Sequence, residues 1–191
     1  MSEKMFPINR SESGPFDSSE IELPVGYLDF GAIRLTATPD IAIKLEVEEA
    51  TGRVVALTIE RGASTLQVSV FAASKHEGVW AEVIQQLTDS IGAAGGAVRA
   101  VSSQLGTTLE ADIVTAGEMP RSIRFIGVDG PRWFLRGSVT GAALTDAAEA
   151  AEIEQIFRSL VIHRGDAPMP PKEALEIVVP AGIITPPRPG L

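Results

Sequence analysis

Cysteine is absent from this sequence, and histidine occurs only twice in 191 residues. Without cysteine the chain has no disulfides, no thiolate metal ligands and no cysteine nucleophile, which suits a reducing compartment. His76 and His163 have no second histidine or acidic residue at metal-ligand spacing. We therefore predict no metal site.

Basic residues are scarce. There are 16 Lys and Arg against 25 Asp and Glu, giving a net charge of −9, and no block of the chain is basic. A groove for nucleic acid needs clustered Lys and Arg, so we expect no nucleic-acid binding through bulk charge. No apolar run approaches the roughly 18 residues of a membrane span, and the N-terminus has no apolar signal region. We expect a cytoplasmic protein with no membrane contact.

The motifs of common catalytic sites are also missing. Gly-x-Ser-x-Gly, which would mark a nucleophilic serine, does not occur, nor does the phosphate-binding Gly-x-x-x-x-Gly-Lys-Ser/Thr. Glu46, Glu48 and Glu49 resemble carboxylates paired for acid–base chemistry, but they end an exposed strand, where solvated charges are the better interpretation. We predict no catalytic residues and no cofactor.

The remaining composition, 45% hydrophobic and 21% charged, is that of a globular domain. Residues 1–26 mix Ser, Glu, Gly and Pro and are expected to form a flexible acidic arm. Residues 27–165 carry the periodic patterns of a single domain. Proline recurs in residues 166–191, which predicts an extended tail whose segment Leu175–Val179 is a candidate for docking at a sheet edge.

Within the domain, alternating apolar and polar residues predict an α+β fold with a curved, mostly antiparallel sheet of six to nine strands. Two principal helices interrupt the strands. The first is expected to begin at a Ser74/Glu77 capping box and to bury Trp80. The second is expected to be capped by Thr145 or Asp146 and to bury Phe157.

Residues 121–141 form the most informative stretch, with two strand-like runs on either side of Asp129-Gly130-Pro131. Alternation places Phe134 and Arg136 on one face and Trp133 on the other. Two interpretations are open: structural ion pairs, with Glu110 or Asp112 facing Arg136, or a partner- or anion-binding site with an aromatic stacking surface. We expect Arg136 to be paired and Arg132 to be free. The candidate site residues are Arg124, Asp129, Arg132, Trp133 and Arg136, with Asp129 capping its own turn.

Several long stretches resemble one family. The run Arg124–Gly137 is similar to the hallmark of domain of unknown function 3710, as are Gly14–Asp17, Asp29–Leu35, Val68–Ala73 and Ala151–Phe157. The resemblance covers roughly residues 14–180. It implies an actinobacterial origin and a gene often beside that of dUTPase, and it carries over no activity. The order of strands and helices more loosely resembles the Mog1/PsbP-like α/β/α sandwich.

These observations favour a non-catalytic interaction or binding domain with a protein partner, including a second copy of itself. The alternative is a small-molecule binder or enzyme for a nucleotide or phosphorylated metabolite, which the resemblance to a dUTPase neighbour suggests.

Overall fold

The computed structural model describes residues 2–23 and 25–180. Its centre is a seven-stranded antiparallel sheet with the strand order β4-β5-β6-β10-β9-β8-β7. The bounds of these strands are β4 Ile41–Val47, β5 Val54–Arg61, β6 Ser64–Ala72, β7 Ala97–Ser103, β8 Gly106–Ile113, β9 Arg121–Asp129 and β10 Trp133–Gly141. The prediction of an α+β fold with mostly antiparallel strands is confirmed.

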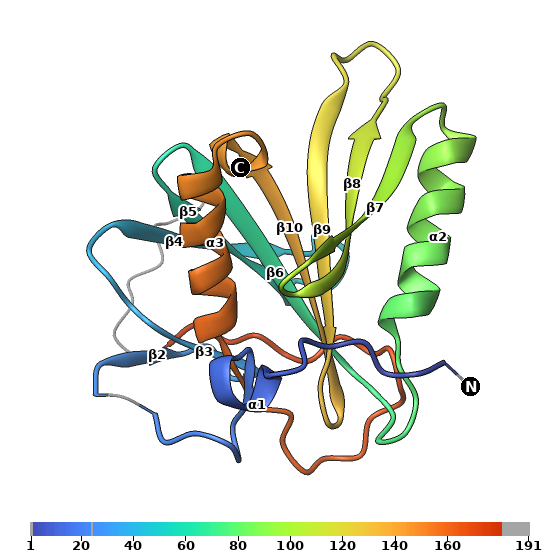
Figure 1. The fold of residues 1–191 in the computed structure, drawn as a ribbon. Coiled ribbons are helices and arrows are strands. Elements are labelled where there is room, and N and C mark those ends of the chain that lie inside the picture. Colours follow the sequence, from blue (N-terminus) through green and yellow to red (C-terminus); the bar gives the residue numbers. More distant parts are fainter. Residues whose placement is uncertain (1, 24, 181–191) are drawn as a thin grey trace.

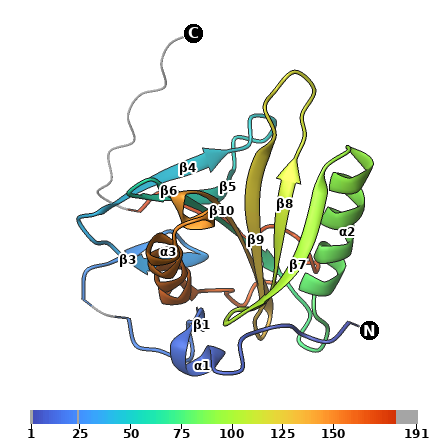
Figure 2. The same ribbon diagram turned by 45° about the horizontal axis from the view of Figure 1, so that its top comes forward.

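Both faces of this sheet carry a hydrophobic core, because successive strand residues point to opposite sides. Leu135 belongs to the larger cluster, which also contains Phe157 of helix α3 (Ala147–Ser159). Phe134 belongs to the smaller cluster, which contains Trp80 of helix α2 (Trp80–Ala93). The two long helices therefore lie on opposite faces of the sheet (Figures 1 and 2).

The two helices begin in different ways. The Asp146 carboxylate caps α3 as predicted, accepting bonds from the N–H groups of Ala148 and Glu149 at 2.8 and 3.1 Å. Helix α2 does not begin at the predicted capping box. It begins at Trp80, and the Ser74 hydroxyl instead accepts a bond from the His76 N–H. A cap from elsewhere in the chain replaces the local one.

A second, four-stranded sheet has the order β1-β11-β3-β2 and packs under α3. Its strands are β1 Phe16–Asp17, β2 Tyr27–Asp29, β3 Ile33–Thr36 and β11 Val161–Ile162. Residues Tyr27 to Thr36 are apolar enough for one strand but form two, β2 and β3. The two strands are separated at Gly31, whose φ of +78° is a left-handed conformation that glycine adopts at little cost.

The segments expected on either side of the domain lie against it. Near the N-terminus, β1 pairs in parallel with β11, and the short helix α1 (Arg10–Ser13) precedes it. Near the C-terminus, Leu175 and Ile177 are buried, and Ile177 bridges Gly31 and Val54. This agrees with the docking expected for Leu175–Val179. Residues 181–191 of the predicted tail lie outside the described residues.

Candidate functional site

The five candidate residues share one hairpin but do not form one site. Arg124 and Trp133 point to the α3 face of the sheet, whereas Arg136 points to the α2 face. Asp129 and Arg132 lie at the hairpin end. Strand alternation predicted that Arg136 and Trp133 would point to opposite faces, and the structure places each among different neighbours.

Asp129 is 1% exposed and caps helix α2. Its carboxylate accepts bonds from the backbone N–H groups of Val79 at 2.8 Å, Trp80 at 3.3 Å and Met5 at 2.9 Å. We expected Asp129 to cap its own turn, and this differs because the hairpin end lies beside the first turn of α2. The carboxylate therefore joins three segments of the chain.

Trp133 is fully buried and is not a surface for stacking a partner. Its indole N–H donates to Asp17 Oδ2 at 2.8 Å, and the Arg10 guanidinium lies 5.6 Å from the ring. Burial would raise the pKa of Asp17, but hydrogen bonds from Ser19 and Trp133 outweigh burial and hold that pKa below its ordinary value. The indole is thus occupied within the chain.

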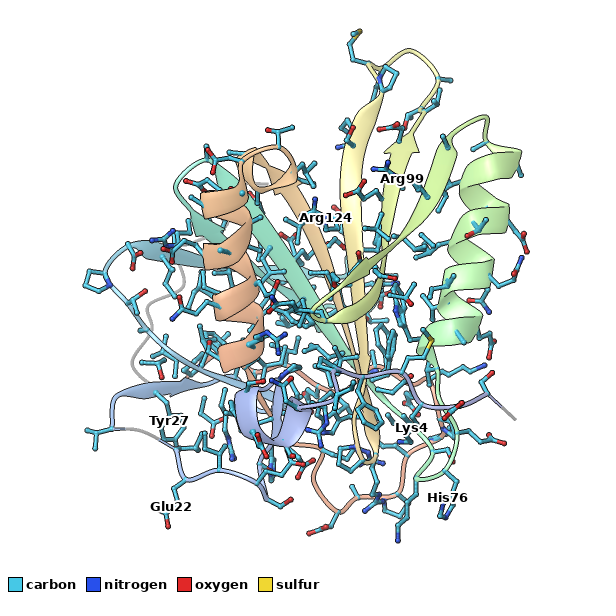
Figure 3. All side chains as sticks on the ribbon, viewed as in Figure 1. Lys4, Glu22, Tyr27, His76, Arg99 and Arg124 are labelled. Carbon is cyan, nitrogen blue, oxygen red and sulfur yellow. The ribbon has the colours of Figure 1, made fainter. Side chains whose placement is uncertain are left out.

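Arg124 is engaged on the α3 face. Its guanidinium donates to Glu110 Oε1 at 3.1 Å and to the Ala143 carbonyl at 3.2 Å. Arg99 also bonds to Glu110, and the bonds from Arg99 and Arg124 lower the pKa of Glu110. The three side chains line a groove of about 420 Å³ on strands β7, β8 and β9, beside Leu144 and Thr145. Figure 3 labels Arg99 and Arg124 on these strands.

Arg132 is exposed, and its side chain makes no hydrogen bond or ion pair with residues 2–23 or 25–180. The backbone around it is fixed, because its carbonyl accepts a bond from the Ala73 N–H at 2.9 Å. The side chain matches the expectation of a free arginine next to the turn.

Arg136 differs from the expectation of an ion pair. Glu110 is taken by Arg124 and Arg99, and Asp112 accepts from Ser122, because β9 lies between β8 and β10. Arg136 is half-buried and has no hydrogen-bond or ion-pair partner among the described residues. Its guanidinium lies 5.5 Å from the centre of the Phe71 ring. Burial lowers the pKa of Arg136.

Arg136 lines a pocket of about 180 Å³ between α2 and strands β6 and β10, which we name the Arg136 pocket. Lys172 lies at this pocket and donates to both carboxylate oxygens of Glu82 at 2.6 Å. Ser69 faces Arg136 directly across the strand pair. The lining residues are Phe71, Val79, Glu82, Val83, Gln86, Phe134, Arg136 and Lys172.

Sequence reasoning missed Lys172, Glu82 and Phe71 as parts of this site. Lys172 and Glu82 are 90 residues apart, and no periodic pattern relates them. Phe71 alternates correctly on its strand, but only the pairing of β6 with β10 sets it opposite Phe134 and beside Arg136. That pairing was the missing information.

Other titratable groups do not assemble a reactive site within the described residues. His163 Nδ1 lies 3.0 Å from the Ser18 hydroxyl, but the pair is exposed on the surface. Glu46 accepts from the Thr58 hydroxyl at 2.7 Å. Residues 2–23 and 25–180 contain no group of three His, Asp or Glu side chains placed to hold a metal ion. None of the helices in these ranges is long and apolar enough to span a bilayer.

The fold and this pocket define an α+β domain with a small, partly apolar cationic site. The chain belongs to the family described as Protein of unknown function (DUF3710), whose profile matches residues 14–185. The comparison with curated proteins found no match, and neither did the comparison with solved structures. The resemblance noted in the sequence is thus confirmed at the level of the family.

Proposed function

We propose that this chain is a non-catalytic binding domain for a protein partner, and that the Arg136 pocket receives one side chain of that partner. The observation that carries the proposal is Arg136 itself. A half-buried guanidinium without a partner in the described chain is unfavourable unless something else supplies one. A bound partner would supply that missing acceptor.

The other buried charges support binding over catalysis, because they are engaged in holding the fold. Asp129 accepts three backbone bonds, and Arg10 is paired with Glu20. A general acid or base needs a proton-transfer group that is available to a substrate. These groups are instead bonded to neighbouring parts of the chain.

The size of the Arg136 pocket favours a side chain over a nucleotide. Its volume is about 180 Å³, whereas pockets for drug-sized ligands occupy roughly 300–1,000 Å³. Anchoring residues of protein interfaces fill small, well-packed pockets of this kind. We expect the binding to take place in the cytoplasm, consistent with a sequence free of cysteine.

The test compares proteins captured from a native lysate by the wild-type chain, by Arg136→Met and by the control Arg53→Met, which replaces an exposed arginine between β4 and β5. We expect the wild type and the control to retain the same partner and Arg136→Met to lose it. Equal capture by all three would contradict the proposal. Light scattering on the purified protein separates a second copy of this chain from a different partner.

The alternative, a binder or enzyme for a nucleotide or phosphorylated metabolite, has its best place in the Arg124 groove. Its volume of about 420 Å³ and two arginines favour an anionic ligand, but Glu110 already neutralises part of their charge. A ligand present at 100 times its Kd would raise the unfolding free energy by about 2.7 kcal/mol. A thermal-shift series over nucleotides detects such a change, and its absence would remove this alternative.

We also propose that the fold is of the Mog1/PsbP-like α/β/α sandwich type and that the protein is actinobacterial. Helices on opposite faces of an antiparallel sheet support the Mog1/PsbP-like sandwich arrangement. An actinobacterial origin is implied by the family resemblance.

A further inference from the structure

The guanidinium of Arg136 lies over the Phe71 ring, 5.5 Å from its centre, and its N–H groups have no hydrogen bond among the described residues. A cation–π contact uses the charge of the guanidinium and consumes none of its N–H donors, so these stay available. Two of these donors can bind the two oxygens of a carboxylate at once. Ser69, opposite Arg136 on β6, is buried and offers the guanidinium no hydrogen bond.

The walls of the pocket are apolar next to this cation. Phe71, Phe134, Val79 and Val83 supply four of its eight lining residues. A small inorganic anion has no apolar surface to bury against these walls, so they would add little to its binding free energy. A charged group on a short hydrocarbon stem would bury its stem against them while its head reaches Arg136.

The charges at the pocket favour a ligand with one negative charge. Lys172 is neutralised by Glu82, which also accepts a bond from Gln86 at 3.0 Å. Arg136 is then the one uncompensated charge among the eight lining residues. One guanidinium balances a single carboxylate, whereas the second charge of a phosphate dianion would stay uncompensated beside the apolar walls.

Building on the proposed function, we infer that the Arg136 pocket recognises a carboxylate on a short apolar stem, supplied by a glutamate side chain of the partner. The pocket volume of about 180 Å³ accommodates one such side chain. The guanidinium of Arg136 binds the carboxylate, and Phe71, Phe134 and Val83 contact the methylene groups.

The experiment titrates the wild-type protein with three probes: N-acetyl-glutamate methylamide, the matching glutamine compound and inorganic phosphate. NMR follows the Arg136 Nε–H and the ring protons of Phe71 and Phe134. We expect saturable shifts at these positions with the glutamate probe. The glutamine probe and phosphate should bind roughly tenfold more weakly or worse, because only the carboxylate makes the charge-assisted pair without a second charge.

Two variants complete the design. Arg136→Met should abolish the shifts of Phe71 and Phe134, and Arg53→Met, at an exposed arginine between β4 and β5, should leave them unchanged. Equal binding of the glutamate and glutamine probes, or tighter binding of phosphate, would overturn the inference, and both outcomes are read on the wild-type protein.

The outcomes also separate the ligand from the function. If the glutamate probe causes no shift at millimolar concentration while partner capture still depends on Arg136, the carboxylate inference is wrong and the proposed function stands. If the probe binds at Arg136 while capture is the same for every variant, the pocket is a carboxylate site and the proposed function is wrong.

Discussion

Two charged residues of the β9–β10 hairpin have opposite surroundings. Asp129 is buried and accepts bonds from three backbone N–H groups, whereas Arg136 is half-buried and lacks a partner among the described residues. A buried charge stabilises a fold only when its hydrogen bonds are satisfied. Asp129 therefore stabilises the fold, whereas the donors of Arg136 are unsatisfied within the described chain, which is the observation behind the proposed binding site.

We predict that Asp129→Ala lowers the free energy of unfolding by about 2–3 kcal/mol, because it removes a helix cap and leaves buried N–H groups unsatisfied. Urea denaturation followed by circular dichroism measures this change. The matched control is Asp146→Ala, which removes the exposed cap of α3 and should cost about 1 kcal/mol. If the two variants lost the same free energy of unfolding, the buried cap Asp129 would contribute no more than the exposed cap Asp146, which would contradict this prediction.

We predict that Arg136→Met changes the free energy of unfolding by less than about 1 kcal/mol. It loses the contact with Phe71, and it relieves the cost of keeping an unpaired charge half-buried. The measurement is the same denaturation series. A loss of about 3 kcal/mol or more would mean that Arg136 has a buried partner, since breaking such a pair costs that much.

At the residue scale, the sequence predicted which face of the sheet a side chain occupies, but it did not predict which residues that side chain contacts. The period of two in a strand assigned Phe134 and Trp133 to opposite faces correctly. It could not reveal that β9 separates Arg136 from Glu110, because strand order depends on contacts distant in the sequence. The missing ion pair of Arg136 follows from that order.

At the scale of elements, helix α2 packs closely on the sheet because Trp80 contacts a glycine, Gly127 of β9. A Cβ atom built on Gly127 would lie 2.1 Å from the ring of Trp80, so the indole lies directly on the strand backbone. The indole N–H donates to the Thr107 carbonyl at 2.8 Å. The glycine of β9 thus sets how closely the helix approaches the sheet.

We predict that Gly127→Ala lowers the free energy of unfolding by about 1–3 kcal/mol or more, because the methyl group would overlap Trp80. Gly92→Ala is the matched control on α2 itself, where an added Cβ meets nothing within 4 Å. It should stabilise the protein by about 0.4–1 kcal/mol. Thermal unfolding of the two variants checks both signs, and a neutral Gly127→Ala would contradict this packing.

The two helices also show when a local pattern predicts a boundary. Asp146 caps α3 because the N–H groups that it accepts from lie only two and three residues further along the chain. The Ser74/Glu77 pattern predicted the start of α2 wrongly, because Asp129, distant in the sequence, provides the cap at Trp80. A local motif is informative only when no stronger acceptor reaches the same N–H groups from elsewhere.

For the whole molecule, the N-terminal segment closes the fold. Phe16 pairs with Val161, Asp17 accepts from Trp133, and Arg10 is bonded to Glu20. Lys4 bonds to the Gly130 and Pro131 carbonyls at the hairpin end. The composition of residues 1–26 indicated a flexible arm because these contacts are polar and widely spaced, and they leave no hydrophobic period to detect.

We predict that acid weakens this closure. Burial would raise the pKa of Glu20, but hydrogen bonds from Arg10 and from the Asp17 backbone outweigh it, so the pKa of Glu20, like that of Asp17, is lowered on folding. Groups with a lowered pKa stabilise the fold above their unfolded values, near 3.8 for Asp and 4.5 for Glu, and this contribution is lost as the pH falls through the folded values. The free energy of unfolding should therefore decline below about pH 5.

Urea midpoints at several pH values between 7 and 3 measure this decline. The slope should be smaller in Glu20→Gln, which cannot titrate at this position. Glu12→Gln, an exposed substitution on α1, should keep the wild-type slope. A wild-type slope in Glu20→Gln would assign the acid sensitivity to other carboxylates.

The parallel pairing of β1 with β11 also has a consequence for synthesis. Phe16 and its partner Val161 are about 145 residues apart, which a ribosome working at 5–20 residues per second covers in roughly 7–30 s. Throughout that interval the nascent chain carries β1 without the strand it pairs with. The β1–β11 pair therefore forms only after β11 has been synthesised, so this part of the smaller sheet is completed late in folding.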